Sequence, residues 1–359
     1  MLIDGGSWRE SWGDAGPSDK DLPSKLDLLC RIAKEVGTPV AILRQVPFQP
    51  ALGGLREDAL IAATFKKFYE TRDPTWPLLP AMARAASAGM DAVTEISQEQ
   101  WGYRIESFTV TGASKRGWTT YLVAACDRRV KAIAPMVIDM LNLGPQMKHQ
   151  LAAWGSYSPQ IGDYTRLGLQ QLITTPLGKQ LSNLVDPFQH ARFLTMPKIV
   201  ILGTNDPYWP VDASRFYFDQ LPDPSAILNV PNNGHGLSDI PRVVGSIGGL
   251  HRCVAENKPV PSLKTEFIRQ AGELQITVMT DSNPLSVYVW QAFSDTRDFR
   301  AATWTGRRVQ LDAKGRCVAE IAEPETGFTA GMIEAQFDLG GTFPLSLTTE
   351  VRVVPDKRE

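Results

Sequence analysis

Three polar side chains of this sequence have the types and the spacing of a nucleophile, an acid and a base. Ser114 ends a short apolar strand, Asp206 follows the apolar run 199–203, and His235 lies in a glycine-flanked loop after residues 226–230. A serine hydroxyl attacks acyl groups when a histidine accepts its proton and a carboxylate orients that histidine. The chain order serine, aspartate, histidine is that of α/β-hydrolases. We therefore predict a triad of Ser114, Asp206 and His235 that cleaves a peptide or an ester acyl bond.

Two members of this triad have alternatives. Ser114 can also be an ordinary N-cap of the helix that follows it, because serine is a favoured cap residue. The usual G-x-S-x-G pattern is incomplete, since Arg116 holds the place of the second glycine and Gly117 follows one residue late. Asp212 is the alternative to Asp206 as the carboxylate that orients the histidine, although it can instead cap the helix that begins near Ala213. A surface position is the alternative for a loop histidine.

The same chemistry needs N–H donors for the oxyanion that forms during attack. In α/β-hydrolases the residue after the nucleophile supplies one donor, and a loop after a neighbouring strand supplies the second. The backbone N–H groups of Lys115 and Gly6 have these places, because the pair Gly5-Gly6 directly follows the strand-like residues 1–4. A flexible N-terminus is the alternative interpretation of that glycine pair.

A series of short apolar segments, separated mostly by helical patterns, must position these groups. Such alternation predicts an α/β fold with a mostly parallel sheet that is covered on both faces. The expected strands are 39–46, 106–111, 130–138, 197–203 and 226–230, and the expected helices are 24–37, 56–71 and 76–96. We assign residues 1–257 to this catalytic domain.

Residues 144–195 interrupt the alternation, because a single helix would normally join the two strands on either side. A long insertion after a strand end often covers a site. We expect a helical cap, whose alternative is a plain helical extension with its own core. The expected substrate-binding side chains come from this cap and from the preceding strand end: Trp154, Tyr157, Tyr164, Asp139 and Asn142.

The pattern changes after the linker-like residues 258–261. Alternating apolar and polar residues, with turn residues about every ten positions, predict an immunoglobulin-like β-sandwich over 262–355. Trp290 and Trp304 are candidates for its core or for a seam with the first domain. This domain has no histidine, so we expect a structural or docking role and no chemistry from it.

Composition excludes several classes of partner. The chain has 359 residues, a net charge of −2, 43% hydrophobic and 21% charged residues. This balance is typical of a globular protein and gives no basic surface for nucleic acid. No apolar run is long enough for a transmembrane helix. The four cysteines have no metal-ligand spacing, so we expect neither a metal nor another cofactor. No signal peptide is visible, and localisation stays open.

The amino-acid sequence resembles that of the PhoPQ-activated pathogenicity-related protein family. The resemblance covers nearly the whole length and is carried by these segments: 111–120 (TGASKRGWTT), 127–130 (DRRV), 134–142 (APMVIDMLN), 231–235 (PNNGH) and 297–300 (RDFR). It implies an α/β-hydrolase-like fold related to serine peptidases of the prolyl-oligopeptidase type, and export for many members. The family carries the same S-K-R-G form, which accounts for the incomplete glycine pattern. One departure is Pro207-Tyr208-Trp209, where the family often has an acidic residue and phenylalanine; Tyr208 and Trp209 then form an altered pocket wall.

The resemblance also bears on the start of the chain. Family members usually have a stretch before the strand that carries the oxyanion glycines, so we expect a fragment or a wrongly assigned start. We then expect a sheet of about six strands that lacks its first strands and exposes 39–46 as an edge. That edge is apolar and poorly protected against pairing with another chain. The competing function is a non-catalytic binding or signalling protein that has kept a hydrolase shell.

Overall fold

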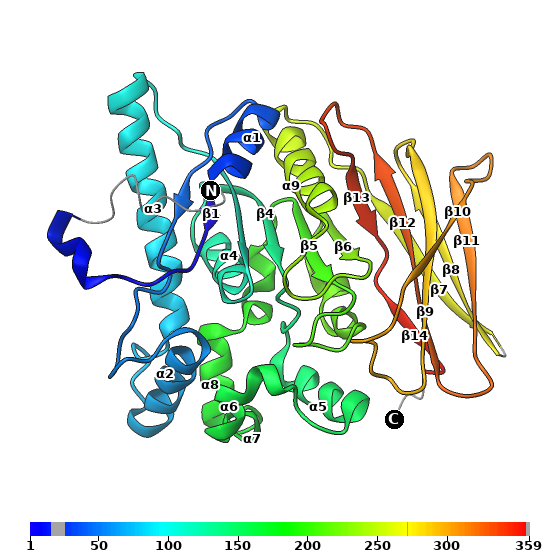
Figure 1. Ribbon diagram of the computed structural model, residues 1–359, viewed down its shortest axis with the longest axis horizontal. Coiled ribbons are helices and arrows are strands. Elements are labelled where there is room, and N and C mark those ends of the chain that lie inside the picture. Colours follow the sequence, from blue (N-terminus) through cyan, green and yellow to red (C-terminus); the bar gives the residue numbers. More distant parts are fainter. Residues whose placement is uncertain (16–25, 271, 357–359) are drawn as a thin grey trace. The chain divides into compact units, whose positions relative to one another are not determined.

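The computed structural model describes residues 1–15, 26–270 and 272–356. The chain divides into two compact units, and each is described by itself. The first comprises Met1–Pro135 and Asp163–Met196, and the second comprises Met136–Gly162 and Pro197–Glu359. Figure 1 shows the elements of both. The boundary between the two units passes through the insertion 144–195. The role of this insertion as a cap stays a prediction. The domain boundary expected near residue 258 also stays a prediction.

The first unit contains short parallel strands and most of the helices. Strand β1 pairs in parallel with β2 on one side and with β3 on the other. Its elements are β1 (Leu2–Ile3), η1 (Glu10–Ala15), α1 (Leu26–Val36), β2 (Ile42–Leu43), α2 (Glu57–Thr71), α3 (Leu78–Trp101), β3 (Phe108–Ala113), α4 (Lys115–Cys126) and β4 (Val130–Met136). The part of the insertion in this unit is helical: α6 (Gly162–Arg166), α7 (Leu169–Leu172), α8 (Pro176–Val185) and η4 (Pro187–Phe193).

Strand β2 is shorter than the eight residues expected for 39–46. Pro39 begins this stretch and Pro47 follows it, and Gln45 has a left-handed φ of 62° that turns the chain out of the ladder. Backbone bonds from Gln45 and Val46 to the carbonyls of Gly5 and Asp4 still hold the segment against the N-terminal strand. Among the described residues, β2 stands at the end of the strand order with β1 as its strand neighbour.

The second unit continues with two parallel strands and then becomes antiparallel. Strand β5, with the sequence KIVILG, is buried along its whole length and pairs in parallel with β6. The elements are α5 (Leu143–Trp154), η3 (Pro159–Ile161), β5 (Lys198–Gly203), η5 (Ala213–Phe216), η6 (Phe218–Gln220), β6 (Ser225–Val230), α9 (Ile240–Ala255), β7 (Leu263–Gln270), β8 (Glu273–Thr280), β9 (Ser286–Ser294), β10 (Thr305–Val309), β11 (Arg316–Ala322), β12 (Phe328–Phe337), β13 (Leu345–Thr348) and β14 (Arg352–Val354).

The C-terminal strands are not separate from the parallel ones. Strand β13 pairs antiparallel with β6 through Thr348 and Ile227, and β12, β9 and β10 follow in order beyond it. The expectation of about six strands is therefore wrong, because β6 has a second neighbour and the sheet does not end there. Strands β11, β8 and β7 form a further antiparallel sheet. Its Ile321 side chain fills the space where a Cβ at Gly331 of β12 would lie, so the two sheets pack face to face.

Candidate active site

Ser114 lies at the turn between β3 and α4 with a strained backbone. Its φ and ψ are 58° and −127°, and its side chain makes no capping hydrogen bond at the N-terminus of α4. The ordinary N-cap alternative therefore lacks the bond that defines a cap. A non-glycine residue in this region costs about 1–3 kcal/mol, and such strain persists where the surrounding structure enforces it.

Close packing between β3 and α4 enforces this turn. A Cβ added at Gly112 would lie 2.7 Å from the backbone oxygen of Arg116, so a side chain at this position has no space. A Cβ at Gly5 would similarly lie 2.6 Å from the Arg116 guanidinium. Two glycines thus make room for Arg116, the residue that takes the place of the second glycine in the G-x-S-x-G pattern.

The side chains that follow Ser114 enter a network of charges at the start of α2. Lys115 Nζ lies 3.0 Å from Glu57 Oε2 and 3.1 Å from Asp58 Oδ2. Arg116 donates to both carboxylate oxygens of Glu57, at 2.6 and 2.9 Å, and to the carbonyl of Val46 at 2.6 Å. Burial alone would raise the pKa of Glu57, but hydrogen bonds from Arg116 and a buried glutamine, with the nearby positive charges, lower it to about 2.

Gln49 connects this network to the expected oxyanion loop. Its amide donates to the Gly6 carbonyl at 2.7 Å and to Glu57 at 2.6 Å, and it accepts from the Glu57 N–H at 2.8 Å. Gly6 has a φ of 119°, which favours glycine. Lys115 opens α4, where backbone N–H groups have no acceptor within the helix. The assignment of these two N–H groups to an oxyanion stays a prediction.

In the second unit, the expected acid and base are in direct contact. His235 Nδ1 lies 2.8 Å from Asp206 Oδ2, while the other carboxylate oxygen of Asp206 accepts from the Tyr208 N–H at 2.9 Å. The Tyr208 ring stacks on the imidazole with centroids 4.1 Å apart. A neutral histidine that donates from Nδ1 to a carboxylate has Nε2 available as a proton acceptor. This dyad has the arrangement that general-base catalysis requires.

The rival carboxylate has other partners. Asp212 contacts His149 Nε2 at 2.6 Å and Arg297 at 2.7 Å. Asp212 is 2% exposed, so it needs such partners to remain charged. Burial opposes ionisation, but His149 and the arginines hold the pKa of Asp212 below its usual range.

The remaining residues expected at a substrate site lie in varied surroundings. Asp139 is buried and accepts from the Tyr217 hydroxyl at 2.6 Å. Burial raises the pKa of Asp139 to about 8, although the hydrogen bond from Tyr217 by itself lowers that pKa. The Asn142 amide donates to the Phe216 carbonyl at 2.9 Å. Trp154 lies under the Arg300 guanidinium, whose carbon is 4.3 Å from the ring centroid.

Three aromatic residues complete this set. Tyr164 donates to Asp58 at 3.1 Å, so it joins the charge network of the first unit. Tyr157 is half-buried, and Trp209 is buried. Tyr164 belongs to the first unit, whereas Tyr157 and Trp209 belong to the second. Their assignment to substrate binding stays a prediction.

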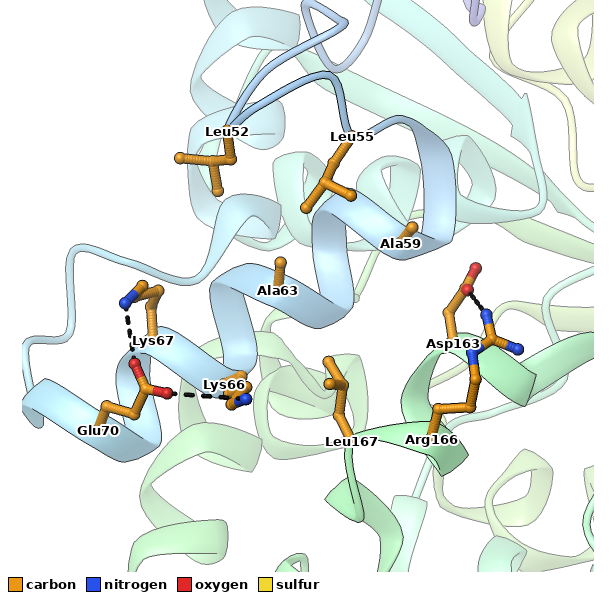
Figure 2. Close-up of a pocket in the computed structure, with 10 residues that line it drawn as sticks. All are labelled: Leu52, Leu55, Ala59, Ala63, Lys66, Lys67, Glu70, Asp163, Arg166 and Leu167. Atoms are coloured by element: carbon orange, nitrogen blue, oxygen red, sulfur yellow. Dashed lines mark hydrogen bonds and ion pairs between the residues drawn. The ribbon is translucent and has the colours of Figure 1, made fainter.

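A separate surface groove lies in the first unit between α2 and residues 163–167 (Figure 2). Its floor is apolar, with Leu52, Leu55, Ala59, Ala63 and Leu167 among the lining residues. The charged residues at its rim bind one another: Lys66 and Lys67 pair with Glu70, and Arg166 pairs with Asp163. None of the expected site residues lines this groove, and its paired charges offer no unsatisfied group for catalysis.

Sequence reasoning missed the groups that hold the site together. Glu57, Asp58 and Gln49 are all far from Ser114 in sequence, and the one available signal was the Lys-Arg pair after the serine, which needs partners when buried. Within the described residues, no group of three or more histidine, cysteine or acidic side chains is arranged to hold a metal ion. No helix in the same residues is both long and apolar enough to span a membrane.

Comparisons with known proteins agree with the family resemblance that the sequence motifs predict. The profile of the PhoPQ-activated pathogenicity-related protein family matches residues 1–300. The autocrine proliferation repressor protein A of Dictyostelium discoideum is 30% identical over 390 residues, which cover 99% of this chain and 77% of that protein. The expected family resemblance is therefore confirmed.

Similar solved structures include hydrolases. A puromycin hydrolase is 17% identical, with a TM-score of 0.37, over 47% of this chain and 25% of its own, so the match spans a quarter of that enzyme. Est1E of Butyrivibrio proteoclasticus is 14% identical, with a TM-score of 0.38, over 71% of this chain and 86% of its own. An acetyl xylan esterase of Paenibacillus sp. R4 is 12% identical, with a TM-score of 0.41, over 65% and 68%. The mostly parallel sheet, the helices and the strand–turn–helix at Ser114 confirm the expected α/β-hydrolase-type fold class.

Proposed function

Because this chain belongs to the PhoPQ-activated pathogenicity-related protein family, we propose that it is a serine hydrolase of peptide or ester bonds. The observation that carries this proposal is the pairing of His235 with Asp206 at 2.8 Å, in the chain order of α/β-hydrolases after a strained serine turn. Backbone strain at Ser114 supports the proposal further, because strained residues cluster at active sites. The substrate is a small molecule or a peptide with an accessible acyl bond.

In the proposed reaction, Ser114 Oγ attacks the acyl carbon while its proton moves to His235 Nε2. Asp206 accepts the Nδ1–H of His235 and stabilises the imidazolium. The N–H groups of Lys115 and Gly6 stabilise the oxyanion. The imidazolium then protonates the leaving amine or alcohol, which gives an acyl-enzyme, and water activated by His235 releases the acid and restores Ser114.

A second candidate is a non-catalytic binding or signalling protein. The name of the Dictyostelium relative, an autocrine proliferation repressor, favours it, since that name describes a signal and not a reaction. A protein that has lost catalysis is free to lose triad residues, whereas this chain retains all three residue types. Retention supports the enzyme, and chemistry with a serine-directed probe separates the two candidates.

The test is covalent labelling by a fluorophosphonate, with turnover of aminoacyl and short acyl esters as the second readout. We expect wild-type protein to be labelled and Ser114→Ala to be unlabelled, with turnover lowered about 10⁴-fold or more. Ser282→Ala is the matched control and should behave as wild type, because Ser282 lies in a turn of the β-rich region and bonds Asp281. Absence of labelling in folded wild-type protein would favour the binding protein.

A further inference from the structure

A short segment of the C-terminal region lies against both loops of the acid–base dyad. We name residues 299–304 the clamp segment, residues 204–209 the acid loop and residues 231–236 the base loop; all three belong to the second unit. Phe299 and Trp304, at the two ends of the clamp segment, are each 2% exposed. Their side chains share one core cluster with the following residues of the same region: Ala292, Ala330, Met332, Val351 and Val353. Both ends of the clamp segment are thereby fixed.

The acid loop is attached to this segment through Asn205, the residue before Asp206. The Asn205 amide nitrogen lies 2.7 Å from the Ala302 carbonyl oxygen, 3.2 Å from that of Phe299 and 3.3 Å from that of Arg300. One side-chain amide nitrogen thus lies within hydrogen-bonding distance of three backbone carbonyl groups of the clamp segment. Because the amide is planar and directional, it fixes orientation as well as distance.

The base loop is attached to the same segment through Asn232. Its amide nitrogen donates to the Trp304 carbonyl at 2.9 Å, and its amide oxygen accepts from the Trp304 N–H at 2.7 Å. Asn232 therefore forms both bonds that a neighbouring strand would form with Trp304. Its backbone φ of 56° lies in the left-handed region that asparagine tolerates better than most residues.

The two loops are also bonded to each other. The Thr204 hydroxyl donates to the Asn205 side-chain oxygen at 2.8 Å and accepts from the Asn232 N–H at 3.0 Å. The Asn205 N–H donates to the Asn233 carbonyl at 2.9 Å. A Cβ at Gly203 would lie 2.4 Å from that carbonyl oxygen, so the loops are in the closest contact that the backbone allows.

We infer that the clamp segment positions the dyad, with Asn205 and Asn232 as positioning residues that keep Asp206 and His235 in hydrogen-bonding register. Within the part of the chain that the structure describes, the side-chain amides of both asparagines bond to the clamp segment and not to Asp206 or His235, so each acts through its own loop. The C-terminal region then has a role in catalysis although it supplies no catalytic side chain. This inference rests on the proposed function for its kinetic consequence, but the hydrogen bond it concerns exists with or without turnover.

The kinetic test compares Asn205→Ala and Asn232→Ala with a matched asparagine of the same region. Asn229 on β6 also joins the C-terminal strands, through Thr348 Oγ1 at 3.0 Å and the Thr349 carbonyl at 3.1 Å, but it lies in a strand and not in a loop of the dyad. We expect the two loop variants to lower kcat about a hundredfold with KM unchanged, because small misplacements of catalytic groups cost this much. Asn229→Ala should lose thermal stability and keep kcat.

A structural readout makes the inference independent of turnover. The Nδ1 proton of a histidine bonded to a carboxylate gives a low-field proton NMR signal, which His235→Ala would assign. This signal should be present in wild type and in Asn229→Ala, and weakened by exchange with water in Asn205→Ala and Asn232→Ala. Wild-type kcat in both loop variants, an equal loss in Asn229→Ala, or an unchanged signal in the loop variants would overturn the positioning role. A wild-type protein with no turnover but with the expected NMR pattern would sink the proposed function alone.

Discussion

The turn at Ser114 and the loops of the dyad are held by two different kinds of contact. In the first unit, Lys115 and Arg116 form ion pairs with the carboxylates of Glu57 and Asp58. In the second unit, asparagine amides bond to backbone groups of the clamp segment, and no formal charge takes part in those bonds. These two sets of contacts should therefore respond differently to pH, since only the ion pairs depend on ionisation.

The physical origin of the difference lies in what each segment buries. Helix α4 buries the cations Lys115 and Arg116, which are 7% and 8% exposed, and a buried cation is tolerable only with a partner of opposite charge. The dyad loops instead bring backbone carbonyl and N–H groups close together. A neutral amide satisfies such groups without the desolvation cost of a charge.

The largest effect on the Ser114 turn should come from Gly112→Ala, which leaves every charge in place. Its Cβ would meet the Arg116 carbonyl oxygen at 2.7 Å, and a backbone atom cannot move aside as a side chain can. We expect a loss of about 3 kcal/mol in the free energy of unfolding. Turnover should fall with it, because Ser114 follows two residues later. Denaturant unfolding and ester hydrolysis measure both.

Gly144→Ala provides the control for that substitution. A Cβ at Gly144, in the first turn of α5, would meet no atom within 4 Å. Alanine favours a helix over glycine by up to about 1 kcal/mol, so this variant should be as stable as wild type or slightly more stable. Equal stability of Gly112→Ala and Gly144→Ala would show that close packing does not enforce the Ser114 turn.

An intermediate effect is expected from Glu57→Gln, which removes the charge that Lys115 and Arg116 share. The Glu57 side chain is 40% exposed, so water screens the pair and the loss near neutral pH should be about 1 kcal/mol. The pKa of Glu57 is about 2 in the folded protein, below its ordinary 4.5. Its contribution is thus present above pH 4.5 and is lost as the pH falls towards 2.

The variant should therefore lose less stability than wild type over that acid range, and unfolding free energies at several pH values give the comparison. Asn232→Ala is the matched control from the dyad loops. Its lost bonds are neutral, so its acid dependence should run parallel to that of wild type. If the acid dependence of Glu57→Gln also runs parallel to that of wild type, the ion pairs do not make the stability of the Ser114 turn sensitive to pH.

The smallest effect should come from Tyr164→Phe, which removes a neutral donor from the charge network. The hydroxyl donates to Asp58 at 3.1 Å, and because both groups are partly exposed, water screens the bond and its contribution should be about 0.5–1 kcal/mol. Tyr157→Phe, from the same insertion, should leave stability unchanged, since no described residue forms a hydrogen bond with its hydroxyl. Thermal unfolding of the two variants measures the difference in stability. Equal stability of Tyr164→Phe and Tyr157→Phe would show that the Tyr164 hydroxyl does not contribute to the charge network.

Several features could be predicted from local sequence. The apolar run KIVILG specifies a buried strand, and the helical patterns at 56–71 and 76–96 lie within about five residues of α2 and α3. The turn at Ser114 was predictable because Gly112 and the following helix are contiguous in sequence. The order of Ser114, Asp206 and His235 was also readable, since each follows a strand of its own.

The fold class, the family and the residue types of the site could be predicted from sequence, because they depend on periodicity and on contiguous motifs. The folded chain was needed to show that Asp206, and not Asp212, contacts His235, and that Asp212 pairs with His149. It alone joined β13 to β6 and placed residues 299–304 against the dyad loops. These partners are about thirty to one hundred and twenty positions apart in the sequence, and no periodic pattern relates residues at such separations. A hydrogen bond between them is specified by how the chain packs and not by any one stretch of it.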